Sequence, residues 1–120
     1  MLFLVNGFST GMLGPGSERW GHRAELEFRT LRPCEAGELL RQNRFVSRFG
    51  HSETAWHLSR YLHVRIPVSR EPICPGPGDE VLVASAKHTR AYREGYIGCP
   101  RWVFFLVRWK GEAFSVKSGE

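Results

Sequence analysis

The sequence predicts an α/β (α+β) fold, in which one small domain of residues 1–120 forms a mixed sheet of about five strands flanked by two main helices. Its 120 residues are 42% hydrophobic, enough for one compact core but too few for two ordinary domains. Short apolar or alternating segments, which are typical of strands, recur along the chain. Two other segments carry apolar residues at helical spacing.

The N-terminal part contains two expected strands. Residues 2–8, LFLVNGF, form an apolar run that ends in Asn-Gly, which predicts a buried strand entering a turn. Residues 11–21 supply the glycines and proline of a loop. Residues 22–32 then alternate apolar and charged side chains, which predicts a strand with Leu26 and Phe28 on its buried face.

Two helices are expected next. Residues 35–43 carry apolar side chains at helical spacing, and residues 44–50 are interpreted as the link to a second helix. That helix covers residues 52–63, with Ser52 as its N-cap. Its apolar stripe consists of Ala55, Leu58 and Leu62.

The C-terminal half contains the two clearest strands, residues 80–86 and 102–109. The second of these is apolar on both faces apart from one arginine, which places it in the middle of a sheet or at a subunit interface. Residues 64–68 are expected to form a short edge-like segment, and residues 74–80 a loop. The polar and basic residues 87–100 are typical of a ligand-facing loop or short helix.

Composition limits the classes of function. Cys34, Cys74 and Cys99 lie far apart, which indicates neither a zinc site nor a disulfide framework and favours a reduced cytoplasm. No window approaches the ~20 apolar residues of a membrane span, and residues 1–5 lack the basic lead of a secretory signal. We therefore expect no membrane association.

The net charge and the motifs that are absent bear on the possible chemistry. The net charge of +5 comes mainly from arginine, which either binds an anion or is part of an ordinary solvated surface. Neither a phosphate-binding loop, nor a nucleophile elbow, nor a dense acidic set for Mg²⁺ is present in the sequence. Any phosphodiester chemistry would most simply need no metal and no cofactor.

Three segments carry candidate site residues. His51 precedes the predicted helix start, where it either protonates a leaving oxygen of a docked phosphate or merely packs against the helix. Asn6 and Ser9 follow a strand, where they either hold a ligand or cap a turn. The third segment is either a ligand-facing loop or a solvated one, and its candidates are Lys87, Arg90, Arg93 and Glu94.

The order of these segments resembles the viral ring-nuclease anti-CRISPR family, small proteins of archaeal viruses, phages and some type III CRISPR loci. The resemblance covers nearly the whole chain. It is carried by N-G-F-S-x-x-M-L at residues 6–13 combined with G-H-S-E-T-A at residues 50–55. Residues 24–31, 45–70, 78–86 and 102–109 resemble the remaining conserved segments of the family.

This resemblance implies a homodimer that binds cyclic tetra-adenylate in a pocket across the subunit interface and cleaves it without metal. His51 matches the family's general acid, which protonates the 5′ oxygen while the neighbouring ribose 2′-OH attacks phosphorus. The implied product is a linear adenylate with a 2′,3′-cyclic phosphate. Asn6, Ser9 and Arg70 match ligand contacts of the family, and no long nucleic acid is expected as a partner.

The segment after the penultimate strand departs from the family. Ser85 stands where glutamine is typical, and one extra residue separates Arg90 from Glu94. We assign Ser85, Lys87, Arg90 and Glu94 to the ligand site, with Arg93 as an alternative to Arg90. Two other functions stay open: a protein that sequesters a cyclic nucleotide without cleaving it, and a small basic protein that binds nucleic acid.

Overall fold

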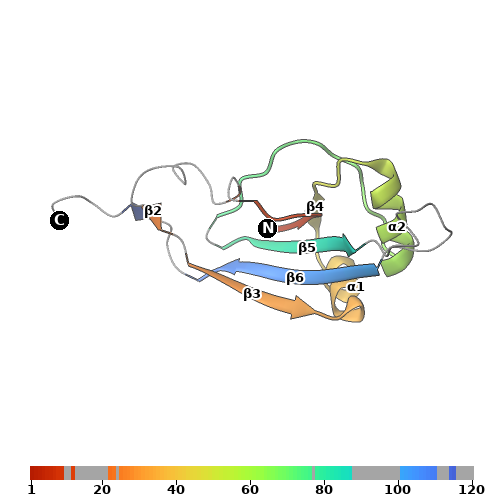
Figure 1. The fold of residues 1–120 in the computed structure, drawn as a ribbon, viewed down its shortest axis with the longest axis horizontal. Helices are drawn as coiled ribbons and strands as arrows, with labels where there is room; N and C mark the ends of the chain where they lie inside the picture. Colours follow the sequence, from red (N-terminus) through yellow and green to blue (C-terminus); the bar gives the residue numbers. More distant parts are fainter. Residues whose placement is uncertain are drawn as a thin grey trace.

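The computed structural model describes residues 1–9, 12, 22–23, 25–76, 78–87, 101–110 and 114–115. Its elements, in chain order, are β1 (Leu2–Val5), β2 (His22–Arg23), β3 (Leu26–Leu31), α1 (Pro33–Gln42), β4 (Phe45–Ser47), α2 (Ser52–Leu62), β5 (Glu80–Lys87), β6 (Arg101–Trp109) and β7 (Phe114–Ser115). Within these ranges, neither helix is long and apolar enough to cross a membrane. The predicted α+β class is confirmed (Figure 1).

Five strands form one mixed sheet, as predicted, in the order β3-β6-β5-β1-β4. Strand β1 pairs in parallel with β4 on one side and with β5 on the other. Strand β6 runs antiparallel to both β5 and β3. A separate two-stranded sheet joins β2 to β7 in antiparallel register.

Both helices pack on one face of the large sheet, and Figure 1 shows α1 behind β6 and β3. The main apolar core lies on this side, where Leu4 and Leu82 of the sheet share a cluster with Leu40 and Leu58 of the helices. The opposite face carries a second apolar cluster that contains no helix residue, formed by Val5, Val81, Val83, Val107 and Trp109. The sheet therefore buries apolar side chains on both faces, but described helices cover only one.

The two-sided apolar pattern of residues 102–109 follows from this arrangement. Trp102, Phe104 and Leu106 point to the helix-covered core, whereas Val107 and Trp109 belong to the opposite cluster. Strand β6 lies between β5 and β3, which confirms the prediction of a strand inside the sheet.

The prediction of one strand over residues 22–32 is wrong in two respects. The segment divides into β2 and β3, which belong to different sheets. Phe28, predicted to be buried, is 57% exposed, whereas Leu31 is buried. The reason is that β3 is an edge strand, and Phe28 lies on the face that the helices leave uncovered.

The start of α1 lies two residues before the predicted one, because Pro33 occupies the first turn. The Glu35 carboxylate accepts hydrogen bonds from the backbone N–H of Arg32, at 3.0 Å, and from its Nε, at 3.1 Å. The backbone bond, followed by the side-chain bond, lowers the pKa of Glu35.

The segment before α2 also corrects the sequence interpretation. Residues 44–50 are more than a link, because they contain the edge strand β4. The N-cap of α2 is His51, with extended φ of −122° and ψ of 126°, so Ser52 is the first helical residue and not the predicted N-cap. The predicted buried stripe is confirmed, since Ala55, Leu58 and Leu62 are all buried.

The segment after α2 is held by one serine of that helix. Ser59 Oγ donates to the carbonyl of Ala55 at 2.7 Å and accepts the backbone N–H of Ile66 at 3.1 Å. Further along, Val68 forms an isolated parallel bridge with Phe49, and this bridge is the extent of strand pairing within residues 64–68, which were expected to form a short edge-like segment. Residues 74–76, 78 and 79 have no regular secondary structure, as the prediction of a loop requires, and Gly78 has a φ of 89°.

We expect Ser59→Ala to lower the free energy of unfolding by about 1–2 kcal/mol, because the part-buried N–H of Ile66 loses its acceptor. Urea denaturation followed by circular dichroism measures the change. Ser52→Ala is the matched control: Ser52 is exposed, and its loss should change stability by less than ~0.5 kcal/mol. Equal effects of the two substitutions would contradict this role of Ser59.

Candidate functional site

The carboxyl ends of β1, β4 and β5 lie at one edge of the sheet, because these three strands run parallel. Such an edge is where open α/β sheets bind ligands. Asn6 and Ser9 follow β1 directly, and Arg48 follows β4. Polar groups from two neighbouring strands therefore meet there.

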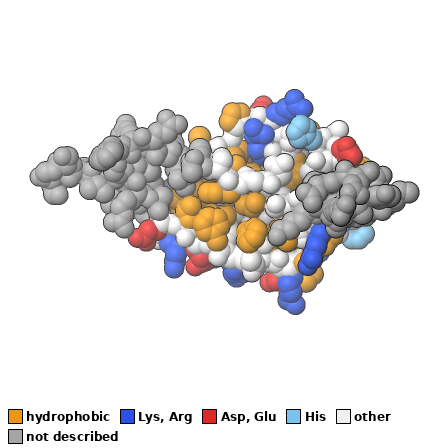
Figure 2. Space-filling view, viewed as in Figure 1, with side chains coloured by type: hydrophobic (Ala, Val, Ile, Leu, Met, Phe, Trp, Pro, Cys, Tyr) orange, Lys and Arg blue, Asp and Glu red, His pale blue; other side chains and the backbone are white. Residues whose placement is uncertain are grey.

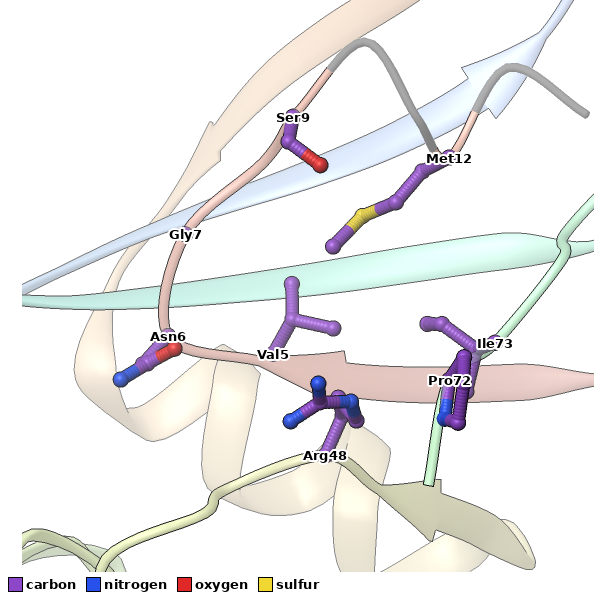
Figure 3. Close-up of a pocket in the computed structure, with 8 residues that line it drawn as sticks. All are labelled: Val5, Asn6, Gly7, Ser9, Met12, Arg48, Pro72 and Ile73. Carbon is purple, nitrogen blue, oxygen red and sulfur yellow. The ribbon is translucent and has the colours of Figure 1, made fainter. Parts of the chain in front are cut away.

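A pocket of about 330 Å³ opens at this edge. Its wall has a polar part, formed by Asn6, Ser9 and Arg48, and an apolar part, formed by Val5, Met12, Pro72 and Ile73, and Gly7 completes the lining. Figure 3 shows the Arg48 guanidinium between Asn6 and the pair Pro72 and Ile73, and shows the Ser9 hydroxyl facing the pocket. The volume is at the lower end of the range for small-molecule sites.

Backbone pairing fixes the position of Arg48. Its N–H donates to the carbonyl of Leu4 at 2.8 Å, which continues the parallel pairing of β1 with β4 by one residue. The next residue, Phe49, is fully buried in the main core. Arg48 is half-buried, and its side chain extends from a backbone that these contacts hold in place.

Arg70 reaches the same region from the segment after α2. Its Nε donates to the carbonyl of Gly50 at 2.9 Å. The Ser69 N–H also donates to the carbonyl of Phe49, at 2.9 Å, which holds the backbone of the two segments together. The Arg70 guanidinium is thereby placed one residue from His51.

His51 is exposed at the N-terminus of α2. Its carbonyl accepts the N–H of Ala55 at 3.1 Å, the first hydrogen bond of the helix, while its side chain makes no capping hydrogen bond. As the N-cap residue, His51 is next to the first turn of α2, whose backbone N–H groups have no partner within the helix and favour a nearby anion.

The structure brings the predicted site residues together in two groups. Asn6 and Ser9 line the pocket, whereas Arg70 is bonded to Gly50, the residue before His51, and neither Arg70 nor His51 is among the lining residues. Ser85 is half-buried in β5, two residues past the last residue that pairs with β1.

The remaining candidates come from the segment after the penultimate strand. The backbone of Lys87 ends β5 at the same edge of the sheet. Arg90, Arg93 and Glu94 lie outside the described residues.

Sequence reasoning missed Arg48, because residues 44–50 were interpreted as a link. The rule that selected Asn6 and Ser9, polar residues directly after a strand, would also select Arg48 once Phe45–Ser47 is assigned as a strand. The sequence signal for this strand was weak, because β4 has three residues and ends in a serine.

No carboxylate lines the pocket, and the described parts of the chain pair neither Arg48 nor Arg70 with an acidic side chain. The same parts contain no cluster of three or more histidine, cysteine or acidic side chains that could hold a metal ion. The arrangement therefore offers cationic and neutral hydrogen-bond donors, together with one imidazole, to an anionic ligand.

Comparisons with known proteins agree with this fold. The solved structure of B116 of Sulfolobus turreted icosahedral virus (STIV) superposes with a TM-score of 0.65 at 21% identity, covering 89% of this chain and 97% of that one. Uncharacterized protein 26 of Sulfolobus islandicus filamentous virus (isolate Iceland/Hveragerdi) is 39% identical over 82 residues. That match covers 68% of this chain and 64% of the relative. The profile of the STIV B116-like family matches residues 2–98, and the chain belongs to this family.

Proposed function

We propose that the protein is a metal-independent ring nuclease that cleaves cyclic tetra-adenylate to linear adenylates with 2′,3′-cyclic phosphate ends. In the cytoplasm of its host it would thereby suppress type III CRISPR signalling. The observation that carries the proposal is the hydrogen bond from Arg70 to the carbonyl of Gly50, which ties a cationic side chain to the residue before His51. Membership of a family with proteins in Sulfolobus viruses supports it.

The chemistry needs few protein groups, because RNA carries its own nucleophile. The ribose 2′ oxygen forms a bond to the adjacent phosphorus and loses its proton to solvent, while the bond from phosphorus to the 5′ oxygen breaks. His51 donates a proton to that leaving oxygen. Arg70 stabilises the charge that develops on the phosphate.

The pocket residues would bind and orient the ring. Asn6 and Ser9 supply hydrogen bonds for a ribose, phosphate or base, and the apolar wall fits a nucleobase. Holding the ribose so that its 2′ oxygen lies in line with the leaving oxygen supplies much of the rate enhancement. The groups assigned to the remainder of the ring are Ser85, Lys87, Arg90 and Glu94.

The apolar sheet face that the helices leave uncovered supports a homodimer. Hydrophobic side chains gather over this face in Figure 2. Phe28 contacts Phe8 edge to face, with ring centroids 5.7 Å apart, and still remains 57% exposed. Val5 belongs to the apolar cluster of this face, Met12 and Ile73 pack against it, and all three line the pocket. A second copy packed here would therefore bring two pockets together.

Incubation with cyclic tetra-adenylate in EDTA tests the activity, with products followed by chromatography and mass spectrometry. We expect linear fragments that end in a cyclic phosphate. Intact ring recovered bound to the protein would instead indicate sequestration without cleavage. Absence of any interaction would contradict the proposed ligand, and steeply salt-dependent binding to long RNA would favour a general nucleic-acid-binding protein.

We expect His51→Ala to lower the cleavage rate by ~10²-fold or more, with ligand affinity nearly unchanged, as loss of a general acid predicts. Single-turnover kinetics and calorimetry measure the two quantities separately. The matched control is His63→Asn, at the other end of α2, where His63 has a φ of 55° that asparagine tolerates. Full turnover by the His51 variant would remove His51 from the mechanism.

Light scattering coupled to size-exclusion chromatography should give a mass near twice the 13.7 kDa of one chain. Phe28→Glu should shift this mass toward that of one chain, because it places a charge in the apolar contact. Val68→Glu is the control, since Val68 is similarly exposed but lies in the segment after α2. A dimer that tolerates Phe28→Glu would show that the copies meet elsewhere.

A further inference from the structure

Arg48 differs from the other pocket residues because it is the cation in the pocket wall. The lining has one arginine, no acidic residue and two neutral hydrogen-bonding side chains, Asn6 and Ser9. In Figure 3 the guanidinium extends into the space between Asn6 and Pro72. An anionic ligand group in this pocket would therefore meet Arg48 first.

A second guanidinium approaches from Arg70. The position that a Cβ on Gly50 would occupy lies 3.7 Å from Arg48 Nη1 and 3.7 Å from Arg70 Nε. Because Gly50 has no side chain, the side chains of Arg48 and Arg70 can both approach this Cβ position. Two positive groups that approach the same point repel each other, and an anion between them removes the repulsion.

The unused hydrogen-bond donors of the two arginines suit a phosphate. Arg70 uses its Nε to donate to Gly50, and its terminal nitrogens make no hydrogen bond within the described residues. Arg48 likewise has no carboxylate partner in the described ranges. Guanidinium groups offer paired N–H donors that match the geometry of phosphate oxygens.

We propose that Arg48 and Arg70 form a two-arginine clamp for one phosphate of the ligand, at the carboxyl ends of β1 and β4. The phosphate would lie between the polar wall of the pocket and the start of α2, and Asn6 and Ser9 would bind the attached nucleotide unit. The identity of the ligand as cyclic tetra-adenylate rests on the proposed function, whereas the phosphate chemistry of the clamp does not.

The test compares binding in the His51→Ala background, which slows cleavage of the ring during the measurement. Adding Arg48→Gln should weaken binding of cyclic tetra-adenylate by ~10-fold or more, because one charged hydrogen-bonding contact is lost. The slope of log affinity against log salt concentration should also become shallower by about 0.7, the value for one phosphate contact on a single strand. Calorimetry at three salt concentrations measures both quantities.

Arg44→Gln in the same background is the matched control. Arg44 is exposed just before β4, whereas Arg48 follows that strand, and the strand between them spans about 10 Å. The two variants lose the same charge, but only Arg48 lines the pocket. We expect the Arg44 variant to bind within about twofold of its parent, while circular dichroism melting checks that both variants are folded.

The outcomes separate the clamp from the proposed function. Ring binding that Arg48→Gln leaves unchanged would overturn the clamp and leave the ring-nuclease proposal standing. Equal losses of ring affinity in the Arg44 and Arg48 variants would also overturn the clamp, because the effect would then come from the change in net charge. If neither wild type nor His51→Ala binds the ring, the proposed function fails, and ³¹P NMR titration with inorganic pyrophosphate tests the clamp alone. Pyrophosphate binding lost in Arg48→Gln would support the clamp, and no binding to wild type would overturn it.

Discussion

Parallel pairing of β1 with both of its neighbours constrains the whole site. Parallel strands end at the same edge of a sheet, so residues far apart in sequence become neighbours wherever β1, β4 and β5 finish. The Arg48 N–H bond to Leu4 continues this pairing past β4 and holds the backbone that leads into α2. If β4 slipped by one residue, Arg48 and Phe49 would exchange faces, which would place an arginine in the core.

The two faces of the sheet have different roles. The helix-covered face holds the larger core, in which the sheet side chains pack against both helices. The other face has its own apolar cluster. Three side chains that belong to this cluster or pack against it also line the pocket. Packing on that face and the proposed ligand binding would therefore involve the same side chains, so the two processes are expected to influence each other.

Sequence patterns predicted the elements in which burial follows the period of a helix or strand. They failed where contacts between distant residues decide the structure. The stripe of α2 and the two-sided strand β6 were predictable, because core packing repeats at the period of each element. Strand β4 was missed, since three residues are too short for a period and their pairing comes from β1, which is distant in sequence. Phe28 was misassigned because alternation shows that two faces differ but not which one the helices cover.

The candidate site was predictable only in part, for a similar reason. His51 and Asn6 have local signals, a helix start and a strand end, that can be recognised in the sequence. The approach of Arg70 to Gly50 depends on a hydrogen bond between residues 20 positions apart, which no local pattern encodes. Arg48 became visible as a pocket residue only when β4 was in place.

The bonds around α2 have a mechanical consequence. Ser59 attaches the following segment to the C-terminal half of the helix, and the bonds from Ser69 and Arg70 attach the same segment to Phe49 and Gly50, just before the helix begins. These bonds tie the segment after α2, together with the Arg70 side chain, to residues at both ends of the helix. Loss of the contacts of this one segment would therefore free both ends of α2 at the same time.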